Sequence, residues 1–239
     1  MFSMRRYHFR LPDHLQSTAN ELNTFSGGPL DKFSTVGSES FRALLDLGLQ
    51  PSHVVLDIGC GALRIGYWLI SFLDSGNYYG IEPNKQMLNE GLTAFFDRDK
   101  LAFKQPRFSN SDNFDFSFLR NGNKNCYDVA LARSIFTHAS LRQIECCFSH
   151  LRAVSHPGSI LLASYLPAKF VRQEHLGDKW VGKSHESNEP GIIKYRFSTL
   201  KEIANKFGFS AYNRPSFLKK VLSQEWLLFV FDESRALNT

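Results

Sequence analysis

Apolar and polar positions follow one another along the chain in blocks that predict strands and helices in turn. The run Val54-Val55-Leu56 has the apolar, β-branched content of a strand that is buried on both faces of a sheet. Similar runs recur at about 78–81, 127–132, 159–163 and 225–231, and helical spacing of apolar residues recurs at about 38–49, 64–73, 84–97, 140–154 and 198–207. This alternation predicts an α/β fold with a largely parallel sheet that helices cover on both faces.

End signals support some of the helix boundaries. Gly48 closes the first predicted helix, and Gly208 closes the last. Ser198 is the expected N-cap of that last helix, although Lys201 stands where a complete capping box has an acidic residue. Residues 1 to about 37 are polar and aromatic, and they predict a helical or loop-rich cap in front of the first strand.

The first strand runs directly into a glycine turn. Asp57 follows the apolar run, and Gly59-Cys60-Gly61 comes next. Because glycine has no Cβ, backbone N–H groups at these positions can approach a ligand closely. The helix predicted from about Arg64 directs the positive end of its dipole toward the same place. The turn therefore predicts a cradle for a nucleotide-like ligand.

A second acidic residue ends the next strand. Glu82-Pro83 follows the run Tyr78-Tyr79-Gly80-Ile81, and a carboxylate at this place can accept hydrogen bonds from two ribose hydroxyls. Dinucleotide-binding and S-adenosyl-binding proteins both use such an acid, so Glu82 does not separate them. The dinucleotide fingerprint, however, has a third glycine three residues after Gly61, and this chain has Arg64 there.

The two motifs together, Leu-Asp-Ile-Gly-Cys-Gly at 56–61 and Gly-Ile-Glu-Pro at 80–83, resemble the first two motifs of class I S-adenosylmethionine-dependent methyltransferases. The resemblance extends over about residues 48–231. It implies a Rossmann-like, doubly wound sheet of seven strands, mostly parallel with an antiparallel last strand, and S-adenosyl-L-methionine as cofactor. Many members carry a third glycine where this chain has Leu63, and Gly66 one turn later is expected to relieve the same crowding.

The resemblance also implies which residues form the cofactor site. Segment 108–114 corresponds to the region where an acid reaches the adenine amino group, and segment 127–134 to the fourth strand and the loop beside the methionine end. Asp115 is an alternative to Asp112 for the adenine, and Arg64 either pairs with the cofactor carboxylate or covers the helix end. The candidate cofactor residues are Asp57, Gly59, Cys60, Gly61, Arg64, Glu82, Pro83, Asp112, Asn113, Arg133 and Ser134.

Two histidines are candidates for the catalytic base. Methyl transfer from a sulfonium needs an in-line nucleophile, and a hydroxyl or protonated nitrogen also needs a base. His138 follows the fourth predicted strand closely, so it either takes this role or caps or packs beneath the loop. His185 is the rival, in an insertion at about 167–197 that is expected to cover the acceptor. The expected division is a cap and lead helix at 1–50 and a methyltransferase core at 51–239.

Two missing motifs narrow the acceptor. After the fourth strand the chain has Ala-Arg-Ser-Ile-Phe-Thr, where amino-methylating nucleic-acid enzymes hold a flipped base with an Asn/Asp-Pro-Pro-Tyr/Phe motif, so a nucleic-acid acceptor is disfavoured. Arg133-Ser134 offers no acidic pair for magnesium, so a metal-independent transfer is expected. The resemblance favours transfer to an oxygen or nitrogen of a small molecule or saccharide, as in bacterial natural-product or glycan tailoring.

Composition and cysteine spacing predict one large, cytoplasmic domain. The chain has 239 residues, of which 43% are hydrophobic, enough for a sizeable core. The four cysteines lack C-x-x-C spacing, the eight histidines lack metal-ligand spacing, and no apolar stretch approaches ~20 residues. The net charge of +5 comes without a run of basic residues and predicts a mixed, solvated surface. A structural metal and a membrane span are therefore not expected.

Two other functions stay open from the sequence. An NAD-dependent oxidoreductase is opposed by Arg64 at the position of the third glycine. A non-catalytic S-adenosyl ligand-binding or RNA-binding relative would keep the cradle and lack a usable acceptor pocket. The sequence determines neither the acceptor atom nor the oligomeric state.

Overall fold

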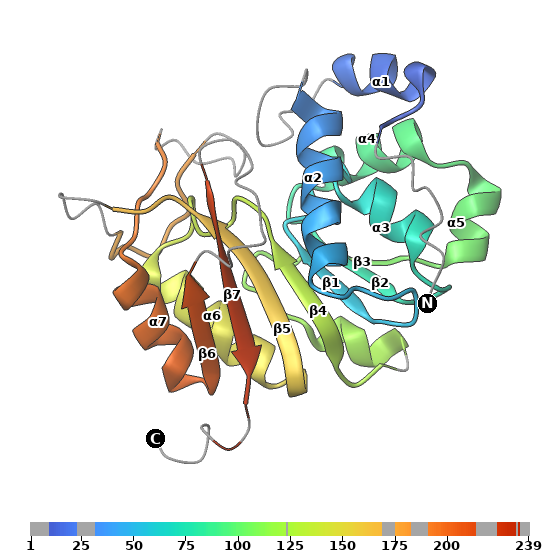
Figure 1. Cartoon of the computed structure of the whole chain (residues 1–239). Coiled ribbons are helices and arrows are strands. Elements are labelled where there is room, and N and C mark those ends of the chain that lie inside the picture. Colours follow the sequence, from blue (N-terminus) through green and yellow to red (C-terminus); the bar gives the residue numbers. More distant parts are fainter. Residues whose placement is uncertain are drawn as a thin grey trace.

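The computed structural model describes residues 10–22, 32–122, 124–168, 175–182, 191–213, 224–232 and 234. In these residues the chain forms one seven-stranded sheet in the order β3-β2-β1-β4-β5-β7-β6 (Figure 1). The strands are β1 Val55–Ile58, β2 Tyr78–Ile81, β3 Arg107–Ser109, β4 Tyr127–Ala132, β5 Ser155–Tyr165, β6 Phe209–Asn213 and β7 Glu225–Phe231.

The strand directions place the candidate site. β1 is parallel to β2 and β4, β2 is parallel to β3, and β4 is parallel to β5, whereas β7 is antiparallel to both β5 and β6. The predicted Rossmann-like, doubly wound sheet with an antiparallel last strand is therefore confirmed. The strand order reverses between β1 and β4. Ligands of such sheets bind beyond the carboxyl ends of the strands at this point.

Helices cover both faces of the sheet. One hydrophobic cluster packs the helices α1, α2, α3 and α4 against one face of the sheet. A second cluster packs α6 and α7 against the other face. Figure 1 shows α2, α3 and α4 grouped together, and α6 and α7 grouped at the end of the sheet that holds β7 and β6. The helices are α1 Asp13–Asn20, α2 Phe33–Asp46, α3 Gly66–Phe72, α4 Lys85–Phe95, α5 Arg98–Lys104, the 3-10 helix η2 Ser117–Gly122, α6 Leu141–Arg152 and α7 Phe197–Lys206.

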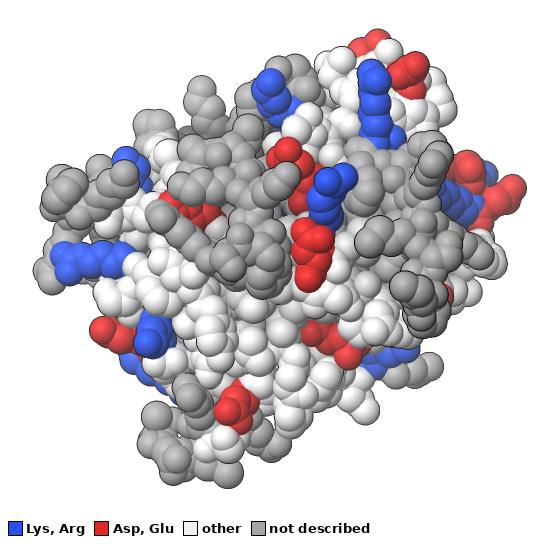
Figure 2. Space-filling view, in the orientation of Figure 1, with Lys and Arg blue, Asp and Glu red and all other residues white. Residues whose placement is uncertain are grey.

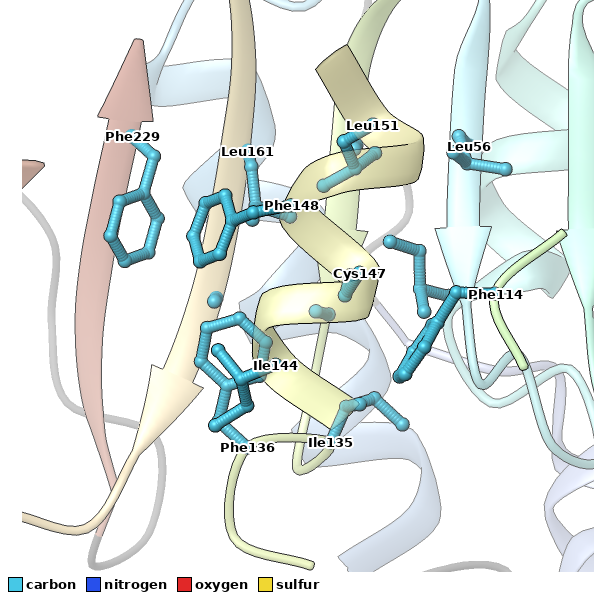
Figure 3. Close-up of a cluster of buried hydrophobic side chains, with 14 of the residues drawn as sticks. Leu56, Phe114, Ile135, Phe136, Ile144, Cys147, Phe148, Leu151, Leu161 and Phe229 are labelled. Carbon is cyan, nitrogen blue, oxygen red and sulfur yellow. The ribbon is translucent and has the colours of Figure 1, made fainter. Parts of the chain in front are cut away.

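A cluster of aromatic side chains in the core lies between α6 and β7. Phe148 of α6 contacts Phe229 edge to face, with ring centroids 5.0 Å apart, and Phe209 at 5.3 Å. Figure 3 shows Phe148 directed at Phe229, with Ile144 and Leu151 on the same side of the helix. Because aromatic side chains bury a large apolar area, this cluster holds α6 firmly on the sheet.

Two predicted helix starts differ in the structure. α7 has Arg196 as N-cap without a side-chain hydrogen bond, so the expected cap at Ser198 is wrong. A complete capping box begins α6 instead: Ser140 Oγ accepts the Gln143 N–H at 3.2 Å, and Gln143 Oε1 accepts the Ser140 N–H at 2.9 Å. α2 begins at Phe33 rather than near residue 38, because buried residues continue its apolar face toward the N-terminus.

The part of the cap that the structure describes is helical. Phe33 of α2 stacks on Phe95 of α4, with ring centroids 5.1 Å apart. α1 and α2 belong to the same hydrophobic cluster as α3 and α4. Residues 1–9 and 23–31 of the predicted cap lie outside the described residues.

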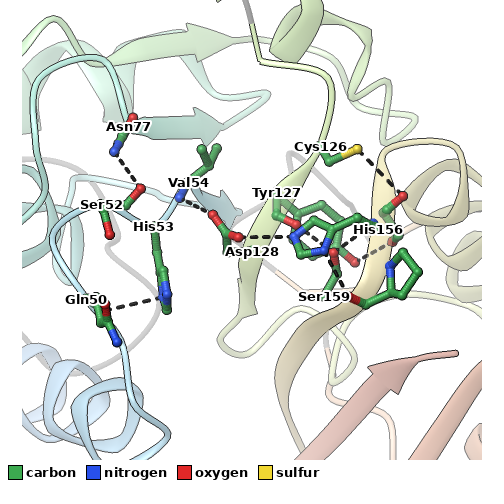
Figure 4. A network of polar contacts seen from close by, with 12 residues as sticks. Gln50, Ser52, His53, Val54, Asn77, Cys126, Tyr127, Asp128, His156 and Ser159 are labelled. Atoms are coloured by element: carbon green, nitrogen blue, oxygen red, sulfur yellow. Dashed lines mark hydrogen bonds and ion pairs between the residues drawn. The ribbon is translucent and has the colours of Figure 1, made fainter.

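The amino-terminal edge of the sheet carries a polar network (Figure 4). Asp128 Oδ2 accepts the Val54 N–H at 2.7 Å, and Asp128 Oδ1 lies 3.0 Å from His156 Nε2. His156 Nδ1 lies 3.0 Å from the Pro157 carbonyl oxygen, and the His156 N–H donates to Ser159 Oγ at 2.9 Å. These bonds join the beginnings of β1, β4 and β5.

Charges of both signs are interspersed over the face of the molecule in Figure 2. The described residues on that face form no large patch of a single sign.

Candidate cofactor and acceptor site

The turn after β1, residues 59–65, is the glycine loop. Gly59 and Gly61 have φ values of 71° and 55°, the left-handed region that favours glycine. The Gly59 N–H donates to the Ile81 carbonyl at 2.8 Å, which ties the loop to the end of β2. A methyl group on Gly59 would lie 2.1 Å from Ile135 Cδ1, so a larger residue here would have to displace the Ile135 side chain and also adopt an unfavourable φ.

Leu63 keeps the loop on a path that usually needs glycine. Its φ is 59°, its side chain is fully buried, and its N–H donates to the Cys60 carbonyl at 3.0 Å. Such a conformation costs a non-glycine residue roughly 1–3 kcal/mol. A methyl group on Gly66 would lie 2.9 Å from Leu63 Cδ2, so Gly66 provides the room for Leu63 that the sequence indicated. α3 begins at Gly66 and not at Arg64, so the predicted helix start is two residues early.

Glu82 holds the glycine loop with its carboxylate. Its side chain is 5% exposed, Oε2 accepts the Gly61 N–H at 2.9 Å, and Oε1 accepts the Asn84 N–H at 2.9 Å. Burial raises the pKa of Glu82, and these two backbone hydrogen bonds oppose the rise. Each carboxylate oxygen has two lone pairs, so both oxygens retain the capacity to accept a further donor.

Asp57 is enclosed by the protein at the end of β1. It is 2% exposed, and its Oδ2 accepts the Tyr78 hydroxyl at 2.8 Å. Burial raises the pKa of Asp57 to about 7; the Tyr78 bond lowers it, and the charge of Glu82 raises it further. Cys60 is buried beside them, and burial raises the pKa of its thiol well above the ordinary range. Asp57 thus has a protein partner where the sequence suggested a ligand contact.

A shallow pocket opens at the carboxyl ends of β1 and β2. Most of its wall is apolar, and Asp112 is its one acidic residue. Apolar walls with a single acid suit a purine ring that carries an amino group. The pocket is lined by Ile58, Gly59, Ile81, Pro83, Ser111, Asp112, Phe114, Ile135 and Trp180.

The structure separates the two acids proposed for the adenine. Asp112 is exposed and lines the pocket. Asp115 Oδ1 accepts the Ser117 N–H at 2.9 Å, which begins η2, and the Ser117 bonds hold the pKa of Asp115 below its ordinary value. Asn113 is exposed and accepts a hydrogen bond from the Ser111 hydroxyl. Asp112 is therefore the acid that the pocket contains, and Asn113 is not part of its wall.

Two arginines lie close together on the α2 side of this edge. Burial lowers the pKa of Arg64 to about 10. The pKa of Arg133 is also lowered to about 10, mainly by burial and in part by the charge of Arg64. The Arg64 guanidinium lies 5.2 Å from the centre of the Phe33 ring, and Glu39 raises the pKa of Arg133. Since Phe33 and Glu39 both belong to α2, the cap interacts with both cations.

Arg133 also fixes the loop after β4. Its Nη1 donates to Ser134 Oγ at 2.8 Å, to Ser164 Oγ at 3.0 Å and to Gln224 Oε1. Gln224 Nε2 donates to Ser134 Oγ at 2.8 Å, and the Ser134 N–H donates to Ser164 Oγ at 2.8 Å. Ser134 has a φ of 64°, so the network holds a strained residue. Sequence reasoning missed Ser164 and Gln224, which only the pairing of β5 with β7 brings here.

Residues 175–182 and 191–196 of the predicted insertion are named the covering segment. Main-chain hydrogen bonds join it at two places to the loop after β4 and at one place to Leu141, the first residue of α6. The Tyr195 hydroxyl also donates to the Ala139 carbonyl at 2.6 Å. The three bonds run from Leu141 N–H to the His175 carbonyl (3.0 Å), from Val181 N–H to the His138 carbonyl (2.9 Å) and from Ile193 N–H to the Thr137 carbonyl (2.8 Å).

His138 lies beneath this segment. Its Nδ1 is 2.9 Å from the Val181 carbonyl oxygen. A carbonyl only accepts, so Nδ1 carries the proton and the neutral ring has its lone pair on Nε2. Burial lowers the pKa of His138, and the Val181 carbonyl opposes this shift, so the ring is neutral at pH 7. The rival base, His185, lies outside the described residues.

The fold and this edge define a class of α/β proteins that bind a nucleoside-containing cofactor beyond β1 and β2. Residues 56–161 match the family model described as a methyltransferase domain. This match identifies residues 56–161 as a methyltransferase domain. Together with the fold, it supports a class I S-adenosylmethionine-dependent methyltransferase with S-adenosyl-L-methionine as its cofactor. The NAD-dependent alternative is not favoured.

Solved methyltransferases have the same fold over most of the chain. Magnesium protoporphyrin IX methyltransferase from Synechocystis PCC 6803 with bound SAM is 18% identical, over 84% of this chain and 79% of that chain, with a TM-score of 0.56. The CcbJ methyltransferase from Streptomyces caelestis is 16% identical over 87% and 99%, with a TM-score of 0.56. Human N-acetylserotonin methyltransferase with SAM is 12% identical over 84% and 53%, with a TM-score of 0.56.

None of the helices in the described residues combines the length and the apolar content needed to cross a membrane. No three or more His, Cys, Asp or Glu side chains among these residues are grouped so as to hold a metal ion.

Proposed function

We propose that this methyltransferase acts on an oxygen or nitrogen of a small molecule or saccharide, as in bacterial natural-product or glycan tailoring. The observation that carries the proposal is the covering segment, which is bonded at three main-chain positions to the loop after β4 and the start of α6. A segment fixed in this way limits the space beside the loop to a compact acceptor. The names of two similar structures also contain small molecules, magnesium protoporphyrin IX and N-acetylserotonin.

The residues at the sheet edge fit the cofactor. A methyl group on Gly61 would meet only Met87 Sδ, at 3.3 Å, so this glycine leaves space beside the loop for a ligand. We assign the pocket with Asp112 and Pro83 to the adenine, and the carboxylate of Glu82 to the ribose hydroxyls.

The methionine end is assigned to the other half of the edge. Arg64 is buried and Arg133 is half-buried, and a carboxylate is a group that can pair with such cations. Ser134 and the N–H groups of the glycine loop complete this part of the proposed site. Asp57 supports the loop through Tyr78.

The proposed chemistry needs little from the protein. The bound cofactor supplies a methyl group that is already electrophilic on its sulfonium. The chain's own residues orient the acceptor and exclude water. His138, with its lone pair on Nε2, takes the proton of an acceptor hydroxyl. The other role open to His138 is to hold the covering segment through Val181. The proposed division into a cap and lead helix, 1–50, and a core, 51–239, follows the same assignment.

A methyl-transfer assay tests this function. Purified protein is incubated with labelled S-adenosylmethionine and separate pools of saccharides, hydroxylated small molecules, amines and RNA, and labelled product is counted. We expect transfer to one of the first three pools. Transfer to RNA alone would contradict the acceptor class. Calorimetry with S-adenosylhomocysteine and NAD provides the binding control, and we expect micromolar-range binding of the first ligand and none of the second. Binding without transfer to any pool would favour the non-catalytic alternative.

A further inference from the structure

Two helices approach the glycine loop so closely that each has a glycine at the contact. In α4, a methyl group on Gly91 would lie 2.5 Å from the carbonyl carbon and oxygen of Ala62 and 2.8 Å from its Cα. In α2, a methyl group on Gly37 would lie 2.3 Å from the carbonyl oxygen of Arg64 and 2.2 Å from Cζ3 of Trp68. Neither position can take a side chain unless the loop or the helix moves.

Backbone conformation does not require glycine at these places. Gly37 and Gly91 lie inside helices, and neither has a positive φ. Glycine is unfavourable in a helix interior, because it loses more backbone entropy on folding than alanine does. The close approach of the loop backbone is therefore the physical reason for both residues.

The contacts of Gly37 and Gly91 lie on either side of the loop residue with a strained backbone conformation. Ala62 and Arg64 flank Leu63, whose φ of 59° is unfavourable for leucine. Immediately before them, the Gly61 N–H donates to Glu82 Oε2 at 2.9 Å. A shift of the gripped residues would therefore move the hydrogen bond that sets the distance between the loop and Glu82.

We propose that Gly37 and Gly91 are positioning residues for the cofactor. They let α2 and α4 clamp residues 62–64 from two sides, and this clamp keeps Leu63 on its strained path and the Gly61 N–H on Glu82. The inference rests on the proposed function in one respect, the assignment of the glycine loop to the cofactor. It makes α2, and with it the N-terminal cap, a part of the cofactor site.

Hydrogen exchange of the ligand-free protein tests the clamp without cofactor or acceptor. In Gly91→Ala we expect the peptide over residues 59–65 to exchange about tenfold faster, because an overpacked contact is relieved by displacing the loop. Peptides from β5 and β7 should exchange as in the wild type. Calorimetry should show S-adenosylhomocysteine binding weakened about tenfold or more.

Leu44→Ala is the matched control. Leu44 is fully buried in α2, two turns beyond Gly37. Its truncation should lower the unfolding temperature, yet leave loop exchange and S-adenosylhomocysteine affinity unchanged. An equal loss of affinity in this control would mean general destabilisation and would overturn the proposal.

A second variant keeps the test decisive if Gly91→Ala does not fold. Gly37→Ala reaches the loop from the other helix, and one of its contacts is the Trp68 ring, a side chain that can shift. Unchanged loop exchange in a folded glycine variant overturns the clamp. Faster exchange with unchanged affinity overturns the positioning role and removes the cofactor from the glycine loop. If the wild type does not bind S-adenosylhomocysteine, the proposed function fails, and the exchange result still decides the clamp.

Discussion

The two edges of the sheet hold acidic side chains in opposite ways. At the amino edge, the side chain of Asp128 is 34% exposed and has the Val54 N–H and His156 as partners. At the carboxyl edge, Asp57 and Glu82 are almost fully buried, and burial raises the pKa of both. An acidic side chain that stays partly hydrated and has hydrogen-bond partners stabilises the fold. An acidic side chain whose burial costs folding free energy instead indicates a functional site.

β1 alone shows this contrast over four residues. Just before the strand, the Val54 N–H donates a hydrogen bond to the Asp128 carboxylate. Near the end of the strand, burial keeps the Asp57 carboxyl group partly protonated near pH 7. The acidic side chain at the amino edge therefore stabilises the folded protein, whereas the buried acidic side chains at the carboxyl edge destabilise it.

His138→Ala tests whether the carboxyl edge carries the chemistry. If His138 is the base, turnover should fall about 10²- to 10⁴-fold, with little change in cofactor affinity. Burial lowers the pKa of His138, so the wild-type rate should rise with pH through an apparent pKa below the ordinary ~6.5, and the variant should lack this limb. His138→Asn is the control, because its amide can still donate to the Val181 carbonyl. Full activity in that variant would leave His138 as a holder of the covering segment.

Asp57→Asn should make the folded protein more stable. The pKa of Asp57 is about 7 in the folded state and ~3.9 when unfolded, so its burial costs stability that grows as pH rises from 4 to 7. Above pH 7 the full cost is on the order of 4 kcal/mol, and asparagine avoids it while still accepting the Tyr78 hydroxyl. Urea unfolding at pH 4, 6 and 8 should show equal stability at pH 4 and a stabilised variant at pH 8. The same pH dependence in both proteins would show that Asp57 is not the titrating group.

Glu82→Ala should weaken S-adenosylhomocysteine by roughly 1.5–3 kcal/mol, the range for hydrogen bonds to a charged group. The fold should survive, because β2 keeps its backbone pairing with β1 and β3. Glu82→Gln, which retains one acceptor oxygen, should lose less. Calorimetry on both variants measures the difference, and an unchanged dissociation constant in Glu82→Ala would place the ribose elsewhere.

Asp128→Asn should have the smallest effect. The pair with His156 is partly exposed, so its loss should lower the unfolding free energy by only about 0.5–1 kcal/mol. Cofactor affinity should not change, because the residue lies at the opposite edge. Urea unfolding and calorimetry on the same sample measure the two quantities. A clear loss of affinity would mean that the two edges are coupled through β1 and β4.

Local pattern was enough to predict most of the fold. The apolar runs of β1, β2, β4 and β7 are long and bounded by turn residues, so their strands could be predicted individually. α5 and β6 were not predicted: α5 has no buried residue, and half-buried or exposed residues fill most of β6. Ser198 failed as a cap because α7 begins one residue before it.

Site residues could be predicted only where a local sequence feature, such as the end of a predicted strand, indicates them. Asp57 and Glu82 were found because each ends a predicted strand. The partners of Arg133 could not be found, because Ser164 and Gln224 are distant in sequence and meet it through sheet pairing. The same holds for Val181 at His138, and for the two helix glycines, which have no motif and matter only through the backbone that they touch.

The attachment of the covering segment has a consequence for how such an enzyme changes its specificity over evolution. Three of its anchors are main-chain hydrogen bonds, which are indifferent to the identity of the side chains beside them. Substitutions at exposed positions such as Leu176 and Ile192 can therefore change the surface of the segment without detaching it. Under the proposed function, changes of this kind at the acceptor would alter specificity. In proteins with this arrangement, single substitutions in the covering segment could change the acceptor specificity while the cofactor site is retained.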